Sequence, residues 1–143
     1  MVQKVIDGTG LILGRLATKV AKLALMGETI HIVNCEKIVI TGNKYRIYDR
    51  YLELGKKGGP FHGPFVQRLP DRFVRRVIRS MLPYKQEKGR LAFKRIKCYI
   101  GVPETLKNNE MISFPEISKE KITKAKLLAI EDLSKRLGAK YNG

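Results

Sequence analysis

The sequence contains only two cysteines, two histidines and no tryptophan among its 143 residues, and these scarcities exclude several classes of protein. Cys35 and Cys98 are too few for a disulfide scaffold, and they cannot form a zinc motif alone. No stretch approaches ~18 consecutive apolar residues, so a transmembrane helix is excluded. The start, Met1 to Asp7, lacks the apolar core of a secretory signal, which predicts a cytosolic protein.

The length predicts a single domain over residues 1–143, since one domain usually takes ~100–200 residues. Apolar residues make up 43% of the chain, which is enough to build a core and excludes wholesale disorder.

Acidic residues are scarce: 13 Asp and Glu stand against 29 Lys and Arg, a formal net charge of +16. Basic residues are concentrated between Lys56 and Lys97, where only Asp71 and Glu87 oppose them. Such a field attracts a polyanion, which is a nucleic acid, an anionic membrane or an acidic protein. A protein adapted to heat would also be rich in charge, but with matched signs in ion-pair networks. The mismatch favours a nucleic acid.

The first third of the chain predicts a β-α-β unit. A strand is expected over 2–6 and a largely buried helix over 15–26, which Gly27 ends. Apolar, β-rich segments follow at 30–33 and 37–40. We expect these strands in a mostly parallel central sheet of about four strands, flanked by helices in a compact three-layer α/β domain.

The rest of the chain predicts further helices, a loop and an arm. Tyr45, Tyr48 and Tyr51 recur every three residues, so we expect them to share one stripe of a helix. Ser118 is the expected cap of the last helix. The expected elements are helices over 44–54, 70–82 and 86–94, a Gly/Pro-rich loop over 55–69, a strand over 96–100, a connecting arm over 101–117 and a C-terminal helix over about 119–137.

The segment after Pro70 carries the clearest functional signal. At 100° per residue, its arginines fall within one arc of the helix, and its apolar residues fall on the opposite side. Arginine binds phosphate in bidentate fashion and stacks on exposed bases. A solvated helix face usually mixes Glu with Lys, so a face of arginines is better explained by a polyanion. The arginines of this face are Arg72, Arg75, Arg76 and Arg79.

The loop over 55–69 is basic and carries aromatic residues. Such a loop can enter RNA grooves and stack on splayed bases, although its two phenylalanines could equally pin it to the core of the protein. His62 has no neighbouring carboxylate to orient it, so we expect it to stack or hydrogen-bond rather than to catalyse. The residues of interest are Lys56, Lys57, Phe61, His62, Phe65 and Arg68.

The glycines at 8, 10 and 14 offer an alternative, a small nucleotide-binding α/β enzyme. They follow a strand and open a helix, and Glu36 could bind a ribose. The spacing is one residue too long for the dinucleotide fingerprint, and no Gly-Lys-Ser/Thr follows to make a P-loop.

Metal and catalytic sites have little support in the sequence. The histidines and cysteines lack paired ligand spacing, and Asp49 and Glu53 are flanked by basic residues, which is typical of helix-surface pairs. We therefore expect a protein that is not an enzyme and needs no cofactor or metal. A basic module for duplex DNA or membrane surfaces is a second alternative, without a recognition-helix motif or a lipidation signal.

Six sequence blocks resemble a known family when they are taken in order: Gly14–Ala17, Ile32–Glu36, Ile40–Lys44, Gly63–Pro64, Arg76–Pro83 and Leu91–Lys97. They are similar, over about residues 5–103, to the large-subunit ribosomal protein family L-thirteen. Gly-Pro-Phe-His at 59–62 and Gly-Val-Pro at 101–103 resemble its archaeal and eukaryotic branch, and the lack of a long C-terminal extension resembles archaeal members. The chain departs from that branch at Ser80, where Gly is usual, and at Tyr84, where His is usual.

This resemblance implies a compact α/β fold around a parallel sheet and a structural, non-catalytic role in the large ribosomal subunit. It implies large-subunit ribosomal RNA and neighbouring ribosomal proteins as partners, with no membrane or small-molecule substrate. By motif, the RNA-facing candidates are Arg15, Lys44, Lys56, Lys57, His62, Arg68, Arg72, Arg75, Arg76, Arg79, Lys85, Lys88, Arg90, Lys94, Arg95 and Lys97.

Overall fold

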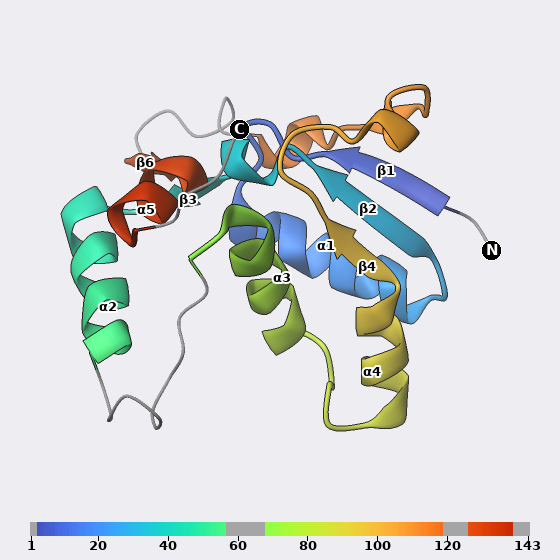
Figure 1. Cartoon of the computed structure of the whole chain (residues 1–143). Coiled ribbons are helices and arrows are strands. Elements are labelled where there is room, and N and C mark those ends of the chain that lie inside the picture. The colour runs from blue at the N-terminus through green and yellow to red at the C-terminus, as the bar shows by residue number, and fades with distance from the viewer. Residues whose placement is uncertain (1–2, 57–67, 119–125, 139–143) are drawn as a thin grey trace.

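The computed structural model describes residues 3–56, 68–118 and 126–138. Within these residues the centre is a four-stranded sheet in the order β4-β2-β1-β5, with every neighbouring pair parallel. Its strands are β1 (Gln3–Asp7), β2 (Thr29–Val33), β4 (Ile96–Cys98) and β5 (Met111–Ile112). The expected α/β fold with a mostly parallel central sheet is confirmed (Figure 1).

Helices account for most of the remaining described residues. The predicted helices over 15–26, 44–54, 70–82 and 86–94 are all present, with ends shifted by one or two residues. The α-helices are α1 (Leu13–Leu25), α2 (Lys44–Lys56), α3 (Pro70–Ser80), α4 (Glu87–Lys94) and α5 (Ile130–Arg136). The short 3-10 helices are η1 (Cys35–Lys37), η2 (Glu104–Leu106) and η3 (Pro115–Ile117).

The first three elements form the predicted β-α-β unit. β1 and β2 pair in parallel with Ile6 opposite Ile32. Leu16 and Val20, one turn apart on α1, are fully buried against this sheet. Gly27 follows α1 with φ of +99°, a conformation that glycine adopts without steric cost and that ends the helix.

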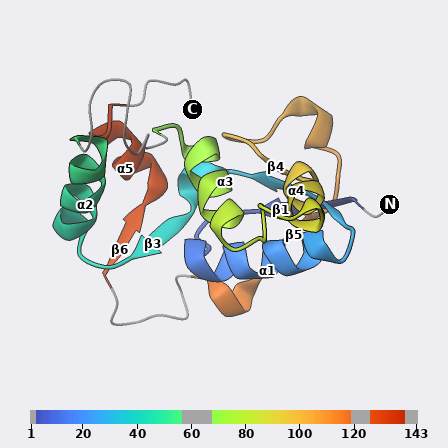
Figure 2. The ribbon, with the colours of Figure 1, turned by 90° about the horizontal axis from the view of Figure 1, so that it is seen from below.

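The two faces of the sheet are covered by different kinds of structure. Ile6 and Ile32 belong to the main core, together with residues of α1, α3 and α4. Val5 and Val33 lie on the opposite face because side chains alternate along a strand, and they pack with Leu106 of η2. This second face is thus covered by the arm around η2 rather than by an α-helix, and Figure 2 shows the sheet between α1 and that arm.

A second sheet of two strands stands beside the first, next to α2 and α5 (Figure 1). β3 (Val39–Thr41) pairs antiparallel with β6 (Leu127–Ala129). The expectation that 37–40 joins the central sheet was therefore wrong, because η1 turns the chain away after β2. The fourth central strand is instead β5, which lies within the segment 101–117 that was expected to be a connecting arm.

The C-terminal helix expected over about 119–137 is shorter than predicted. Residues 119–125 lie outside the described residues, Leu127–Ala129 form a strand, and α5 begins only at Ile130. A short apolar run fits a strand and a buried helix equally well, so the pairing with β3 decides the outcome. Ser118, the expected cap, instead pairs with the turn before α1 in an isolated antiparallel bridge.

Asp7 closes the turn after β1 by accepting three hydrogen bonds. Its Oδ1 accepts them from the backbone N–H of Thr9 at 3.0 Å, the Thr9 hydroxyl at 2.7 Å and the Asn34 side-chain amide at 3.0 Å. Burial raises the pKa of Asp7, but these hydrogen bonds outweigh it, so the pKa lies below its ordinary value of 3.8. The carboxylate therefore stabilises the fold fully above pH 3.8, and this contribution is lost as the pH falls through the lower pKa of the folded chain.

We expect the variant Asp7→Asn to separate this charge from the shape of the turn. The wild type should be more stable than the variant at neutral pH, and the difference should shrink as the pH falls below 3.8. Urea unfolding midpoints of both proteins across this range measure it. A difference that stays constant into acid would show that ionisation of Asp7 does not contribute.

Candidate nucleic-acid interface

Helix α3 has two faces of opposite character, as its periodicity predicts. Phe73, Val74 and Ile78 are buried in the main core. Two of the arginines are half-buried and two are exposed; in chain order from the helix N-terminus they are Arg72 (exposed), Arg75 (half-buried), Arg76 (exposed) and Arg79 (half-buried). The ion pairs found among the described residues lie elsewhere, on Lys4 and Lys19, so no described carboxylate neutralises these guanidiniums at salt-bridge distance.

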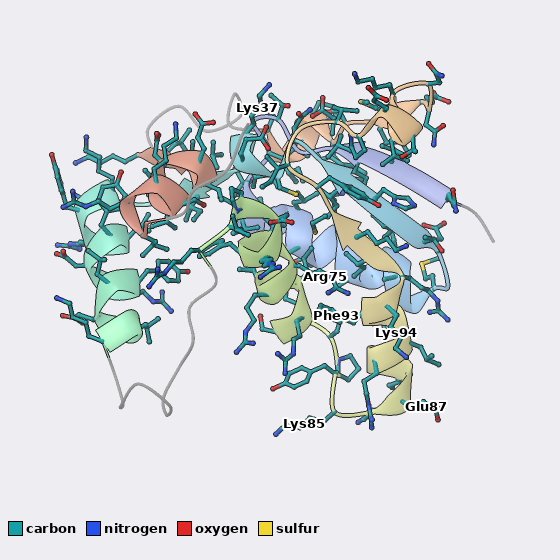
Figure 3. The ribbon with its side chains drawn as sticks, viewed as in Figure 1. Lys37, Arg75, Lys85, Glu87, Phe93 and Lys94 are labelled. Atoms are coloured by element: carbon teal, nitrogen blue, oxygen red, sulfur yellow. The ribbon has the colours of Figure 1, made fainter. Side chains whose placement is uncertain are left out.

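Arg75 is committed to the protein's own structure. Its Nε donates to the carbonyl oxygen of Ile96 at 3.2 Å, and its Nη2 donates to that of Phe93 at 3.3 Å. Its guanidinium carbon lies 4.0 Å from the centre of the Phe93 ring, a cation–π contact. Arg75 thus ties α3 to the end of α4 and to β4, the edge strand of the central sheet (Figure 3).

The other arginines of α3 differ in how firmly they are held. The Arg79 guanidinium lies 4.3 Å from the centre of the Tyr84 ring, so this tyrosine holds the arginine in place. Arg72 and Arg76 make no side-chain hydrogen bond or ion pair to any described residue. Sequence periodicity placed all four side chains on one helix face, but it could not distinguish Arg75, which is occupied, from Arg72 and Arg76, whose guanidiniums no described residue engages.

Two hollows adjoin this face. The first has a volume of about 370 Å³ and is lined by Arg72, Arg75, Arg76, Arg79 and Phe93. The second has a volume of about 320 Å³ and is lined by Asp71, Arg72, Arg75, Lys97, Cys98 and Tyr99. Together they make a concave, cationic surface along α3 and the edge of β4, with aromatic rings in its lining.

The basic residues of α4 and β4 fall into two groups. Arg95 is half-buried, and its Nη1 donates to the carbonyl oxygen of Ala24 at 3.0 Å, which satisfies one of the last carbonyls of α1. Arg90 remains exposed but donates to the carbonyl oxygen of Lys85 at 3.3 Å. The candidates with exposed side chains in this region are Lys85, Lys88, Arg90, Lys94 and Lys97.

The remaining candidates do not join this surface as one cluster. Arg15 is exposed in the first turn of α1. Lys44 and Lys56 are exposed at the two ends of α2, and Arg68 is exposed just before α3. Lys57 and His62, with most of the Gly/Pro-rich loop over 55–69, lie outside the described residues.

One basic site was missed by the sequence analysis. The pairing of β3 with β6 brings Lys126 beside Lys44 and Tyr45 around a hollow of about 390 Å³. Tyr45 is 66% exposed, whereas Tyr48 and Tyr51 pack against the core. The expected tyrosine stripe was wrong because a spacing of three falls 60° short of a full helical turn at each step. No local signal could find Lys126, since the strand pairing alone brings it there.

The glycine turn at residues 8–14 has no room for a dinucleotide. Leu11 and Ile12 are buried where a pyrophosphate would have to approach. The backbone N–H of Gly10 donates to the Lys37 carbonyl oxygen at 3.0 Å, so it is already used within the protein. Glu36, considered as a ribose ligand, is 5% exposed and accepts a hydrogen bond from the Gly101 N–H at 3.0 Å.

The cysteines have a structural environment. A hydrogen bond with the Cys98 thiol and then burial raise the pKa of the Cys35 thiol well above its ordinary value, so this thiol stays neutral and unreactive. Residues 3–56, 68–118 and 126–138 contain no cluster of His, Cys, Asp and Glu with the arrangement of a metal site. In the same residues, no helix combines the length and the apolar character needed to cross a bilayer.

Comparison with known proteins decides the family. Residues 2–105 match the family described as Ribosomal protein L13. The chain belongs to the ribosomal protein L13 family. It is 49% identical over 141 residues to the large ribosomal subunit protein uL13 of Methanocaldococcus jannaschii, covering 96% of this chain and 98% of that protein. It is 43% identical over 135 residues to the uL13 protein of Archaeoglobus fulgidus, covering 94% of this chain and 86% of that one.

Membership of the L13 family confirms the resemblance seen in the six sequence blocks, including its archaeal character. The uL13 protein of Methanosarcina barkeri, 43% identical over 138 residues, covers 96% of this chain and 99% of its own length. The prediction that the chain is not an enzyme is also confirmed, since this is a family of structural ribosomal proteins.

Proposed function

We propose that this L13-family chain is a structural component of the large ribosomal subunit in the cytoplasm, where it binds large-subunit ribosomal RNA and supports subunit assembly. Neighbouring large-subunit proteins are its other proposed partners. The mechanism is neutralisation of phosphates where RNA segments pack closely, combined with recognition of RNA shape.

The observation that carries this proposal is the arginine face of α3. Four guanidiniums repel one another over about two helical turns, and no described carboxylate offsets them at salt-bridge distance. Arg79 is already held on the Tyr84 ring, so little of its side-chain entropy remains to be lost on binding. A planar guanidinium pairs in bidentate fashion with two oxygens of one phosphate, and an RNA backbone offers two non-bridging oxygens on each phosphate.

The proposal predicts a loss of salt dependence when the free arginines are removed. The double variant Arg72→Ala/Arg76→Ala should bind large-subunit ribosomal RNA more weakly than the wild type. The negative slope of log affinity against log salt should become shallower by about 1.5, since each lost phosphate contact reduces its magnitude by ~0.7–0.9. Titration of the RNA across a salt series measures both quantities.

The control is the double variant Lys107→Ala/Lys135→Ala, which removes the same charge from two exposed positions. Lys107 directly follows η2, and Lys135 lies in α5. This control should keep the wild-type slope. Transfer RNA and duplex DNA of equal mass test specificity at the high-salt end of the series. If all three nucleic acids dissociate together there, or if both double variants lose the same slope, the arginine face is not an RNA site.

A further inference from the structure

The hollow between α3 and α4 combines arginine side chains, which suit phosphate, with an aromatic ring, which does not. Its volume of about 370 Å³ falls within the ~300–1,000 Å³ of small-molecule sites. An RNA helix presents only its backbone and groove edges to a protein, and exposed cations on a flat or convex surface suffice to bind it. A concave site with an aromatic ring in its lining has room for a group that an intact helix does not offer.

Part of the lining of this hollow is a guanidinium stacked on an aromatic ring. Phe93 and the Arg75 guanidinium form a stacked pair, with 4.0 Å between the guanidinium carbon and the ring centre. Hydrogen bonds from Arg75 to the carbonyl oxygens of Phe93 and Ile96 hold that guanidinium in place. Aromatic rings and guanidinium planes are the groups on which proteins stack unpaired bases.

The mouth of the hollow is cationic on the exposed side of α3. Arg72 and Arg76 are one helical turn apart and exposed, and their guanidiniums are not engaged by any described residue. Each can bind a phosphate in bidentate fashion. The residues that line the hollow include no carboxylate that would repel a nucleotide.

We infer that this hollow binds a single extruded nucleotide of RNA, whose base stacks on the Arg75–Phe93 pair while Arg72 and Arg76 bind its flanking phosphates. This inference rests on the proposed function, since it names the RNA feature that the same face recognises. It assigns Phe93 and Arg75 to base stacking, a role that neutralisation of phosphates does not require.

Two aromatic variants test the site. Phe93→Leu removes the ring that lines the hollow, whereas Tyr84→Leu removes a ring that stacks on Arg79 without lining it. With large-subunit ribosomal RNA as the probe, base-reactive reagents should show one unpaired nucleotide protected by the wild type and by Tyr84→Leu. Phe93→Leu should lose that protection and bind about tenfold more weakly, within the range that loss of one stacking aromatic costs.

Backbone cleavage by hydroxyl radicals separates this inference from the proposed function. If Phe93→Leu keeps the backbone footprint and loses only the base protection, the extruded-nucleotide site is supported. If the wild type gives a backbone footprint but protects no unpaired base, the site is refuted and RNA binding stands. If the wild type gives no footprint at all, the proposed function fails first.

The exposed arginine gives a readout that does not depend on the folding of a core variant. Arg76→Ala should weaken the protection of the same nucleotide, and circular dichroism should show an unchanged fold. Adenosine monophosphate, added as a competitor, tests whether the hollow binds a free nucleotide instead of a nucleotide of RNA. Protection that persists in excess adenosine monophosphate supports RNA, and binding of that nucleotide as tight as the RNA would overturn it.

Discussion

Replacing Arg75 with alanine should lower the free energy of unfolding by about 2–3 kcal/mol, although sequence analysis places it on the RNA face. The variant loses two hydrogen bonds from a charged donor, to Phe93 and Ile96, and the cation–π contact with the Phe93 ring. The carbonyl oxygen of Ile96, on the edge strand β4, also loses this hydrogen-bond donor. The expected loss is smaller than the sum of typical values for these three contacts, because the two N–H···O distances, 3.2 and 3.3 Å, are long.

The matched control for this prediction is Arg76→Ala. It removes the same charge from the neighbouring position, but its side chain is exposed and makes no hydrogen bond to a described residue. Its unfolding free energy should stay within about 0.5 kcal/mol of the wild type. Arg75→Lys should behave like Arg75→Ala, because an ammonium group cannot make two in-plane hydrogen bonds while stacking on a ring. Urea denaturation of the three variants measures these differences, and equal stability of Arg75→Ala and Arg76→Ala would refute the structural role.

Replacing Gly89 with alanine should destabilise the protein by about 1–3 kcal/mol, a result opposite to the usual effect of alanine in a helix. A Cβ at this position would overlap the carbonyl group of Pro83 and lie 2.8 Å from the backbone nitrogen of Tyr84. The obstacle is backbone, so no side-chain rotation relieves it. The Pro83 carbonyl oxygen also accepts a hydrogen bond from the Gln86 N–H at 2.9 Å, which fixes its position in the turn.

Gly14 provides the comparison for Gly89, since it is also a helical glycine. A Cβ at Gly14 would meet nothing within 4 Å, and the residue is exposed in α1. Gly14→Ala should therefore leave stability unchanged or raise it by up to about 1 kcal/mol, because alanine loses less backbone entropy than glycine on folding. Thermal melting of both variants checks the opposite signs. A Gly89→Ala protein as stable as Gly14→Ala would mean that α4 can shift away from the turn without cost.

These two predictions concern the same part of the molecule. Gly89 lets α4 pack against the turn that carries Tyr84, and Tyr84 holds Arg79. Arg75 then ties the end of α4, at Phe93, to α3. The arginine face is therefore built by packing between α3, the turn and α4, and it depends on more than the sequence of α3.

Local features of the fold could be read from the sequence because they depend on neighbours within a few positions. The repeat of Arg72, Arg75, Arg76 and Arg79 against buried Phe73 and Ile78 follows from helical periodicity, and α3 confirms it. The β-α-β start follows from apolar runs and a glycine that ends α1. The fold class and the positions of α1, α2, α3 and α4 rest on the same local signals.

Other features depend on contacts that no local pattern encodes. The pairing of β3 with β6 brings position 126 beside position 42. Period-two spacing predicts a strand at 37–40, but it cannot name the partner, and an apolar run at 127–130 fits a helix or a strand. Each choice is made by whichever hydrogen-bonding partner the fold places nearby.

The sequence by itself determined that the chain is a basic α/β domain with an arginine-faced helix, since composition and periodicity are properties of the chain alone. Only the tertiary structure decided what each arginine does. The partners of Arg75 lie 18 and 21 residues away, at Phe93 and Ile96, and that of Arg95 lies 71 residues away at Ala24. A guanidinium looks the same in a sequence whether it is free or occupied, because its acceptors are backbone carbonyls that every residue carries.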